Sequence, residues 1–348
     1  MQHPKTTRTH LEMTIDKYHH SHQNVADKLV REYEGPTPFA LYLKTYFAAN
    51  KKHGSKDRKS ISAICYEYFR KLSEAFPLQN FISSAIDIPK FTASHLQQPL
   101  LFIRARPGKK ELVKASLEKA GLFFESIGDM AFALPNTSSL QNIIILNKEA
   151  VIQDINSQAL ASLLKLIPLT EKPLVVWDPC AASGGKSILI KDTMPSVQLH
   201  VSDIRENILF NCEKRLKEAG IQPASLQVVD ITLPFAIKKQ FDFIFADLPC
   251  SGSGTWGRTP ENLQSYTETQ LNTMTKLQEN ILHHLMPAIK IGGYLLAATC
   301  SVYKNENEDQ IEKLVATGKF KLIARQYFIG YDKHADTLFG ALLQKIVD

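Results

Sequence analysis

Two cysteines in the second half of the chain lie in contexts that could support nucleophilic chemistry. Cys250 belongs to the segment DLPCSGSG at 247–254, and Cys300 belongs to TCS at 299–301. Each segment follows an apolar run of strand character. Because the carboxyl ends of parallel strands meet at one edge of a sheet, both thiols are expected at the edge where α/β enzymes place their chemistry.

A loop of small residues follows an earlier predicted strand. It reads Asp178-Pro179-Cys180-Ala181-Ala182-Ser183-Gly184-Gly185-Lys186 and leads into a predicted helix. Small side chains let backbone amides approach a ligand, and a helix N-terminus favours an anionic group such as a carboxylate or a phosphate. The loop matches neither GxxxxGK(S/T) nor GxGxxG, which argues against a kinase or a dehydrogenase. Its position nevertheless predicts a cofactor loop.

Carboxylates stand at the ends of successive predicted strands. Asp178 ends the first strand, Asp203 ends the next, and Asp230 ends the third. In a doubly wound fold the second position carries the carboxylate that binds ribose hydroxyls, and the third lies where an adenine would bind. A single Asp at such a place is more often a helix cap or a turn former. Three of them beside one small-residue loop favour a cofactor site.

The elements that must position these residues are predicted from the hydrophobic pattern after Pro173. The strand candidates are Leu174–Trp177, Gln198–Val201, Leu226–Val229, Phe241–Ala246 and Tyr294–Ala298, with a later pair around Lys321–Tyr327 and Thr337–Leu343. The helices between them include Arg205–Ala219, closed by Gly220, and Glu268–Lys290. This alternation predicts an α/β fold with a doubly wound, mostly parallel sheet.

The first half of the chain predicts two smaller parts. From about residue 24 to 76, apolar residues recur at intervals of three and four, which predicts a small helical unit. Between 99 and 137 a short strand (Leu100–Ile103), a charged helix (Lys109–Ala120) and a strand near Met130–Leu134 form a βαβ-like α+β module. The expected domains are therefore 1–95, 96–145 and 146–348.

The composition is that of an ordinary globular protein. Of the 348 residues, 44% are hydrophobic and 22% are charged, which argues against a disordered or fibrous chain. This length suits two or three domains with ample material for a core. No run of 18 or more uncharged apolar residues occurs, and the first residues lack a signal-like apolar stretch. We therefore expect a cytoplasmic protein with no membrane partner.

Cysteine usage and charge narrow the possible partners. The five cysteines are odd in number, widely spread and free of CxxC pairs, which favours reduced thiols over disulfides or a zinc site, so no metal is expected. A net charge of +6 and a pI of about 8.9 are compatible with a polyanionic partner. The densest basic run, 51–59, suits a solvated loop and a phosphate contact equally well.

These motifs resemble those of the RNA cytosine carbon-5 methyltransferases of the RsmB/Sun/Fmu type, which use S-adenosylmethionine. The loop at 178–186 is similar to the family's DxCAAPGGK, 247–254 to its DxPCSGxG, and 299–308 to its TCS followed by ENE. Supporting matches at 151–158 and 257–261 lie in the right order. The resemblance implies a seven-stranded, Rossmann-like class I methyltransferase sheet. Before it, the resemblance implies a small RNA-recognition-like module and a short helical RNA-binding-like domain.

The resemblance also assigns catalytic roles. Cytosine carbon 5 is a poor nucleophile, so Cys300, which matches the family's nucleophile, would first add to carbon 6 as a thiolate. Cys250 matches the residue implicated in releasing that adduct after methyl transfer. Asp247 could hydrogen-bond the ring at nitrogen 3 or the exocyclic amine. Lys186 could meet the cofactor carboxylate or lower the pKa of a thiol through its charge.

For the cofactor, the resemblance implies contacts from the small-residue loop and from the carboxylates. The expected S-adenosylmethionine contacts are Cys180, Ala181, Ala182, Ser183, Gly184, Gly185, Lys186, Asp203, Asp230 and Asp247. Ser183 stands where the family loop usually carries Pro, a change that loosens the backbone but keeps the amides, so we expect it to be tolerated.

A buried cysteine is more often inert packing than a nucleophile. We apply that interpretation to Cys65, Cys180 and Cys212, although Cys180 lies beside the cofactor loop. The Pro-Cys-Ser-Gly context of Cys250 and the Thr-Cys-Ser context of Cys300 favour function instead.

Other functions stay open at the level of sequence. A DNA cytosine methyltransferase would use the Pro-Cys motif at the fourth strand as its nucleophile, but the second thiol, Cys300, favours the RNA class. A catalytically decayed, RNA-binding ribosome-assembly factor belongs to a different class, and retention of both cysteines and of the carboxylates speaks against it. Among RNAs, small-subunit rRNA is the expected substrate by resemblance, and tRNA is the alternative.

Overall fold

The computed structural model of the protein describes residues 9–35, 37–72, 76–233, 239–263 and 266–348. The first eight residues, on which the expectation about a signal peptide rests, lie outside this part, as does 73–75 of the predicted helical unit. The chain divides into two compact units, Met1–Pro77 with Arg258–Tyr266, and Leu78–Gly257 with Thr267–Asp348. We call them the helical unit and the main unit. The expected boundaries after 95 and 145 stay predictions.

The helical unit forms where apolar residues recur at helical spacing. Its elements are α1 (Thr9–Arg31), α2 (Phe39–Ala49), α3 (Ser55–Leu72) and a 3-10 helix, Pro260–Leu263. Leu29, Phe39 and Ile61 are buried in its core, where the ring of Phe39 meets that of Phe69 edge-on at 4.8 Å. The Glu261 carboxylate accepts the backbone N–H of Phe39 at 3.2 Å and so caps the start of α2.

The basic run 51–59 forms the turn between α2 and α3 together with the first turn of α3. Lys51 and Lys56 are exposed, whereas Nε of Arg58 donates to the carbonyl oxygen of His53 at 2.8 Å. Part of the run therefore stabilises the turn. Whether its exposed lysines contact phosphates stays a prediction.

The main unit begins with a 3-10 helix (Gln79–Phe81), the short helix α4 (Ile88–Ser94) and a small four-stranded sheet. The sheet consists of β1 (Leu101–Ala105), β2 (Glu125–Ile127), β3 (Ala131–Leu134) and β4 (Ala150–Ile152), with α5 (Lys110–Lys119) between β1 and β2. Its order is β2-β3-β1-β4, and all its pairs are antiparallel. The predicted βαβ-like arrangement is therefore wrong: the hairpin of β2 with β3 reverses the chain. The three-residue strands β2 and β4 are too short to show a periodicity of two.

The larger sheet of the main unit has seven strands. They are β5 (Val175–Asp178), β6 (Gln198–Asp203), β7 (Ser225–Val228), β8 (Phe241–Asp247), β9 (Ile289–Thr299), β10 (Phe320–Phe328) and β11 (Leu338–Lys345). Their order is β10-β11-β9-β8-β5-β6-β7, and only β11 runs antiparallel to its neighbours. The predicted seven-stranded, mostly parallel sheet is confirmed.

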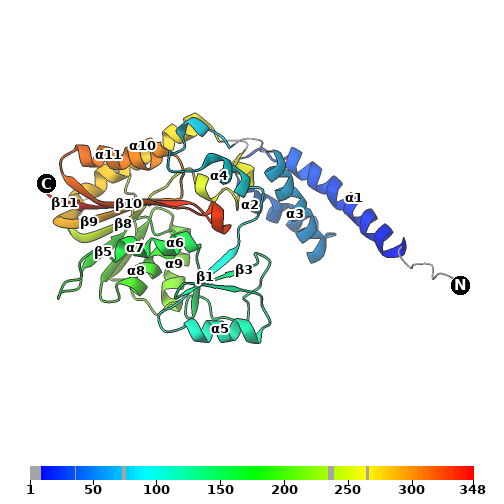
Figure 1. The fold of residues 1–348 in the computed structure, drawn as a ribbon, viewed down its shortest axis with the longest axis horizontal. Helices are drawn as coiled ribbons and strands as arrows, with labels where there is room; N and C mark the ends of the chain where they lie inside the picture. Colours follow the sequence, from blue (N-terminus) through cyan, green and yellow to red (C-terminus); the bar gives the residue numbers. More distant parts are fainter. Residues whose placement is uncertain (1–8, 36, 73–75, 234–238, 264–265) are drawn as a thin grey trace. The chain divides into compact units, whose positions relative to one another are not determined.

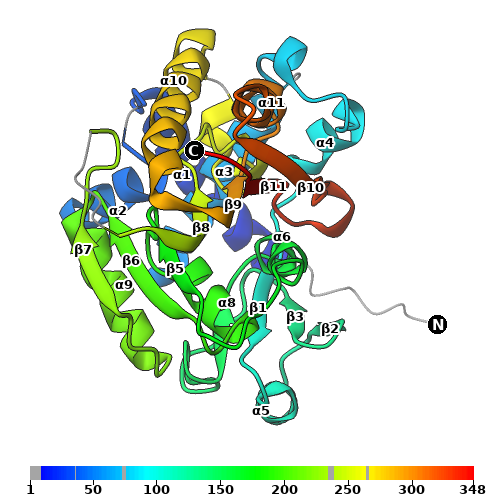
Figure 2. The ribbon, with the colours of Figure 1, turned by 90° about the vertical axis from the view of Figure 1, so that its left-hand side faces the viewer.

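Helices cover both faces of this sheet, as Figures 1 and 2 show. The helices are α6 (Ile155–Ala159), α7 (Ala161–Leu164), α8 (Gly185–Thr193), α9 (Glu206–Glu218), α10 (Glu268–Leu285) and α11 (Glu308–Ala316). On one face Phe243 and Phe245 of β8 pack into the core that includes α8 and α9. On the other face Ile244 and Ala246 pack into the core that includes α10 and α11. Burial on both faces explains why this strand reads as a continuous apolar run.

The predicted helix over Glu268–Lys290 is too long. A capping box between Thr267 and Gln270 starts α10 where expected, but the helix ends at Leu285. Pro287 follows in a short 3-10 turn, because proline lacks the N–H that the next helical turn needs. Strand β9 begins directly afterwards, so Lys290 belongs to a strand rather than to a helix.

The order of the strands fixes where a site can form. From β5 the chain builds outward through β6 and β7, and then returns to the other side of β5 with β8 and β9. A crevice opens at such a switch point, outside the carboxyl ends of the strands. Among the helices in the described part of the chain, none is long and apolar enough to cross a membrane.

Candidate active site

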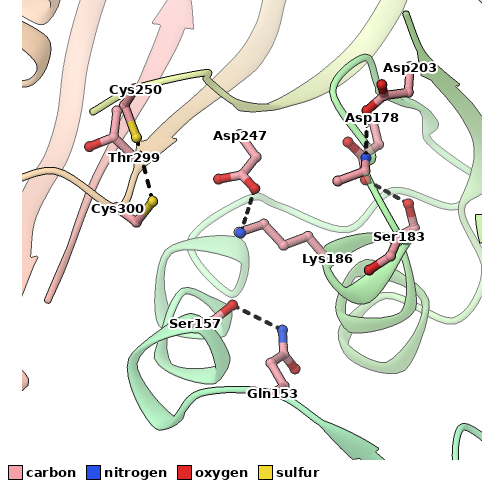
Figure 3. A network of polar contacts seen from close by, with 12 residues as sticks. Gln153, Ser157, Asp178, Ser183, Lys186, Asp203, Asp247, Cys250, Thr299 and Cys300 are labelled. Atoms are coloured by element: carbon pink, nitrogen blue, oxygen red, sulfur yellow. Dashed lines mark hydrogen bonds and ion pairs between the residues drawn. The ribbon is translucent and has the colours of Figure 1, made fainter. Parts of the chain in front are cut away.

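Cys250 and Cys300 are brought together by the pairing of β8 with β9. Asp247, the last residue of β8, pairs with Ala298 in parallel register, so the loops that follow start side by side. The two Sγ atoms lie 3.5 Å apart (Figure 3). The pKa of Cys250 is raised well above its ordinary value. The hydrogen bond to Cys300 is the largest cause, and burial is the second. The raised pKa favours the thiol form of Cys250, and either sulfur atom can be the donor of this contact.

A buried carboxylate connects the two cysteine loops. Glu306 is 1% exposed and accepts hydrogen bonds from the backbone N–H and from Oγ of Ser251, both at 2.6 Å. Ser251 Oγ in turn lies 3.3 Å from Oγ of Ser301. Burial raises the pKa of Glu306, and the hydrogen bonds from Ser251 and Ser301 oppose that shift. Glu306 thus links the residue after Cys250 to the segment that carries Cys300.

Close backbone packing holds the end of the Cys250 loop. The N–H of Gly254 donates to the carbonyl oxygen of Cys300 at 2.9 Å, and the N–H of Thr337 donates to the carbonyl oxygen of Gly254 at 2.9 Å. A Cβ atom on Gly254 would lie 1.9 Å from the Thr337 oxygen. Only glycine fits this position, which gives a physical reason for the last residue of the SGSG sequence.

Lys186 links the loop before α8 to strand β8. Its Nζ lies 2.5 Å from Oδ2 of Asp247 (Figure 3). Burial alone would lower the pKa of Lys186, but the charges of Asp247 and Cys300 outweigh it and raise the pKa overall. The side chain is therefore an ammonium ion that interacts with both a carboxylate and a thiol.

The loop of small residues has an unusual backbone. Ala182 and Gly184 have φ angles of +47° and +83°, in the left-handed region. A Cβ on Gly184 would meet Sγ of Cys212 in α9 at 2.8 Å, so the loop packs directly on that helix. The N–H of buried Ala181 donates to the carbonyl oxygen of Ser202, and Gly185 is the first residue of α8. This packing lets the loop expose backbone at the end of β5.

Asp203 and Asp230 differ in their surroundings. Asp203 accepts hydrogen bonds from the N–H of Ala182 at 2.8 Å and from the backbone and guanidinium of Arg205 at 3.0 to 3.1 Å. Burial would raise the pKa of Asp203, but these hydrogen bonds lower it overall. Asp230, two residues beyond β7, accepts from the N–H and Oγ1 of Thr232, which lowers its pKa. Asp230 is thus a turn former as well as a site candidate.

Asp178 is the most deeply buried of the strand-end carboxyls. It is 0% exposed, and its Oδ2 accepts from Oγ of Ser187 at 2.6 Å. Its Oδ1 is buried without a hydrogen-bond partner in the described part of the chain. Burial raises the pKa of Asp178 to about 7. The side chain therefore titrates near neutral pH.

A cavity of about 540 Å³ lies at the carboxyl ends of these strands. Seven of the expected site residues line it, namely Cys180, Ala182, Asp203, Asp230, Asp247, Cys250 and Cys300. Apolar side chains complete the wall, namely Ile204, Val229, Ile231, Leu248, Leu277 and Ile281. Ala181, Ser183, Gly184, Gly185 and Lys186 support the cavity from the loop and are not among its described lining residues. The structure thus collects the predicted residues at one place.

The other cysteines remain thiols. Burial raises the pKa of Cys65 and of Cys212 to about 12 each, and burial raises that of Cys180 well above its ordinary value. Cys65 is in the helical unit, Cys212 is under Gly184, and Cys180 faces the cavity. Among the described residues, no group of three or more His, Cys, Asp or Glu side chains is arranged to hold a metal ion.

Two residues beside the loop carry no sequence signal. Arg215 of α9 donates through Nη1 to the carbonyl oxygen and to Oγ of Ser183, and through Nε to Oδ1 of Asn147. Both residues lie outside every motif quoted above. Their contacts depend on how the small sheet packs beside α9, which no local pattern encodes. The sequence indicated Glu306 only as part of the match to the family's ENE, and it predicted no role for this residue.

The C-terminal half of the chain matches a known family. Residues 164–335 match the family model described as 16S rRNA methyltransferase RsmB/F. The ribosomal RNA small subunit methyltransferase B of Escherichia coli O127:H6 is 32% identical over 181 residues, covering 49% of this chain and 42% of that protein. The chain therefore spans less than half the length of this curated relative.

Solved structures share the fold. The crystal structure of PH0851 has a TM-score of 0.69 at 21% identity and covers 98% of this chain and 92% of that chain. The structure of NSun6 from Pyrococcus horikoshii with SFG has a TM-score of 0.67 at 15% identity, covering 81% and 98%. At these identities the likeness concerns the fold. The family match is separate from this likeness: residues 164–335, which contain both cysteine motifs, are similar to the RsmB/F family of rRNA methyltransferases, and this supports the resemblance to the RsmB/Sun type.

Proposed function

We propose that this protein transfers a methyl group from S-adenosylmethionine to carbon 5 of a cytosine in RNA, with small-subunit rRNA as the substrate. The observation that carries the proposal is the 3.5 Å separation of the Cys250 and Cys300 sulfur atoms beside a cavity lined with carboxylates. A methylation that proceeds through a covalent adduct must both form and break a bond to the ring. Two adjacent sulfur atoms, one for each step, suit that chemistry.

The cavity fits the cofactor in size and in chemistry. Its volume of about 540 Å³ lies in the usual range for small-molecule sites. Asp203 can accept hydrogen bonds from ribose hydroxyls, and the apolar wall at Ile204 and Ile231 suits an adenine ring. The carboxylates of Asp203 and Asp247 favour a ligand that carries a positive charge. When bound, S-adenosylmethionine supplies an electrophilic methyl group on a positively charged sulfur.

Cys300 carries the first step of the proposed reaction. Its thiolate Sγ forms a bond to carbon 6 of the cytosine, and the electrons of the carbon 5–carbon 6 double bond make carbon 5 nucleophilic. Carbon 5 would then take the methyl group, and the electron pair of the broken bond would stay on the cofactor sulfur. Loss of the carbon 5 proton to water restores the double bond and expels Cys300 as a thiolate. We assign help in this release to Cys250, because its raised pKa keeps a proton beside the departing sulfur.

Lys186 and Asp247 support the same step by their charges. The ammonium of Lys186 interacts with Cys300 through its charge, and a positive charge of this kind suits a sulfur nucleophile. Asp247, 2.5 Å from Lys186, can accept a hydrogen bond from the exocyclic amine of the base. The sequence left two roles open to Lys186, contact with the cofactor carboxylate and an effect of its charge on a thiol. We favour the effect on the thiol.

Methyl transfer from labelled S-adenosylmethionine tests the proposal. Unmodified small-subunit rRNA and tRNA are offered to the wild type, Cys300→Ala and Cys250→Ala. Cys65→Ser, in the helical unit, controls for the loss of a thiol. We expect no transfer with Cys300→Ala and a covalent protein–RNA adduct, stable in a denaturing gel, with Cys250→Ala.

Each other outcome points to a different function. If only tRNA is labelled, the substrate is tRNA rather than small-subunit rRNA. A wild type that binds S-adenosylmethionine but labels neither RNA overturns the RNA assignment and favours the DNA enzyme. A wild type that does not bind S-adenosylmethionine overturns the enzyme assignment altogether and favours a decayed assembly factor.

A further inference from the structure

The loop between β5 and α8 is held by a guanidinium group from α9. Arg215 donates through Nη1 to the carbonyl oxygen of Ser183 at 3.0 Å and to its Oγ at 2.7 Å. Ser183 lies between Ala182 and Gly184, which both have left-handed backbone. One side chain therefore fixes the backbone and the hydroxyl of the residue between two irregular positions.

Arg215 is itself oriented by Asn147. Nε of Arg215 donates to Oδ1 of Asn147 at 3.1 Å, and Nδ2 of Asn147 donates to Oε2 of Glu218 at 2.8 Å. Asn147 is 8% exposed and has a φ angle of +64°, a conformation that asparagine tolerates better than most residues. Its backbone carbonyl oxygen accepts from Nη1 of Arg106 at 2.6 Å. Both polar atoms of the Asn147 side chain, Oδ1 and Nδ2, therefore have hydrogen-bond partners.

These contacts connect the small four-stranded sheet to both ends of α8. Asn147 lies just before β4, and its N–H donates to the carbonyl oxygen of Ala150 at 2.7 Å. Arg104 of β1 and Arg106, just after it, both donate to the Asp192 carboxylate near the end of α8, at 2.6 and 2.8 Å. The side chain of Asp192 is only 4% exposed. The sheet therefore holds the end of α8 directly and the loop before it through Arg215.

We propose that Arg215 is a positioning residue for the cofactor loop and that Asn147, just before β4 of the small sheet, orients it. The inference rests on the proposed function, because it assumes that this loop binds S-adenosylmethionine. A loop whose backbone is already ordered loses less entropy when it binds a ligand. The proline that the family loop usually carries at this position restricts the backbone through its ring, and Ser183 has no ring. The two hydrogen bonds from Arg215 restrict the backbone at Ser183 instead.

The first test measures S-adenosylmethionine binding to the full chain by calorimetry. Arg215→Lys keeps the charge but cannot reach Asn147 and Ser183 together. We expect its Kd to rise about tenfold, the usual effect of losing a hydrogen bond to a charged group. Asn147→Gly removes the side chain and tolerates the left-handed backbone, so a smaller rise follows. The double variant binds no more weakly than Arg215→Lys, because both changes break the same relay.

Lys217→Ala is the control for a substitution at an exposed position of the same helix, away from the relay. Its Kd stays at the wild-type value. A second readout is hydrogen exchange of the peptide that contains the loop, measured without ligand, which becomes faster in Arg215→Lys while β5 and α8 keep their protection. With RNA present, the KM for S-adenosylmethionine rises and the KM for RNA does not.

The results separate this proposal from the proposed function. If Arg215→Lys binds S-adenosylmethionine as tightly as the wild type and its loop exchanges at the same rate, the positioning role is wrong. If the wild type does not bind S-adenosylmethionine, the proposed function fails, and the exchange measurement still decides whether Arg215 orders the loop. Equal weakening in Lys217→Ala would show that a substitution elsewhere on α9 has the same effect, and it would overturn the relay.

Discussion

The sulfur atoms of Cys250 and Cys300 lie 3.5 Å apart although the two residues are 50 positions apart in the chain. Parallel pairing of Asp247 with Ala298 places the two strand ends side by side. Glu306 then ties the loops that follow, through the backbone and hydroxyl of Ser251. The geometry of the thiol pair is therefore a property of two strands and one buried carboxylate, not of the cysteines themselves.

Replacing Glu306 should disturb the thiol pair without affecting cofactor binding. Glu306→Gln presents an NH₂ group to one of the two Ser251 donors, and the Cys250 loop loses one charge-assisted hydrogen bond. We expect kcat to fall about 10- to 100-fold, in line with a loss of 1.5 to 3 kcal/mol. The Kd for S-adenosylmethionine stays unchanged.

The control for Glu306 is Glu312→Gln on α11, an exposed carboxylate that pairs with Arg325. It should behave as the wild type. Equal kcat values for Glu306→Gln and the wild type would contradict a role of Glu306 in positioning Cys250.

Lys186 should control the reactivity of Cys300. Lys186→Met removes the ammonium whose charge interacts with Cys300, and thiols react faster beside a positive charge. We expect alkylation of Cys300 by iodoacetamide at neutral pH to slow several-fold. Mass spectrometry of the peptide that contains Cys300 measures the rate. Lys186→Arg keeps the charge and should retain most of the alkylation rate. An alkylation rate in Lys186→Met equal to that of the wild type would show that Lys186 does not activate Cys300.

Gly184 and Gly185 offer a test of the loop backbone. Ala at 184 would adopt a left-handed φ and place its Cβ 2.8 Å from Sγ of Cys212, whereas Ala at 185 would meet no atom within 4 Å. We expect Gly184→Ala to lower the free energy of unfolding by at least about 1 kcal/mol, measured without cofactor. Gly185→Ala should leave it nearly unchanged. Similar losses in both variants would show that the local packing is not as described.

Asp178 should make stability depend on pH. Its pKa is raised to about 7 in the folded protein, compared with about 4 for a free Asp. The folded state therefore binds this proton more tightly, so its contribution to stability is complete below about pH 4 and is lost as the pH rises to about 7. Asp178→Asn cannot titrate and should flatten this part of the profile.

Urea unfolding at several pH values between 4 and 8 measures the effect of Asp178. Asp129→Asn, in an exposed turn, serves as the control and should follow the wild type. A profile for Asp178→Asn as steep as that of the wild type would show that another group is responsible.

The type of fold and seven of the residues that line the cavity could be predicted from the sequence. Strands buried on both faces, such as β8, read as continuous apolar runs, and small residues after β5 predicted a ligand loop. The TCS and PCSG motifs located both thiols. These features are local: each follows from a few consecutive residues and from the rule that parallel strands end at one edge.

How these residues act on one another depends on the packing of the elements. Two short strands, β2 and β4, were not predicted, and the small sheet is antiparallel because a hairpin turns the chain back. The end of α10, by contrast, follows from Pro287, a local signal that the predicted helix ignored. The contact of Lys186 with Asp247, the Glu306 link and the relay from Asn147 through Arg215 to Ser183 join residues from separate elements. Such contacts arise from packing, and no periodicity in the chain encodes them.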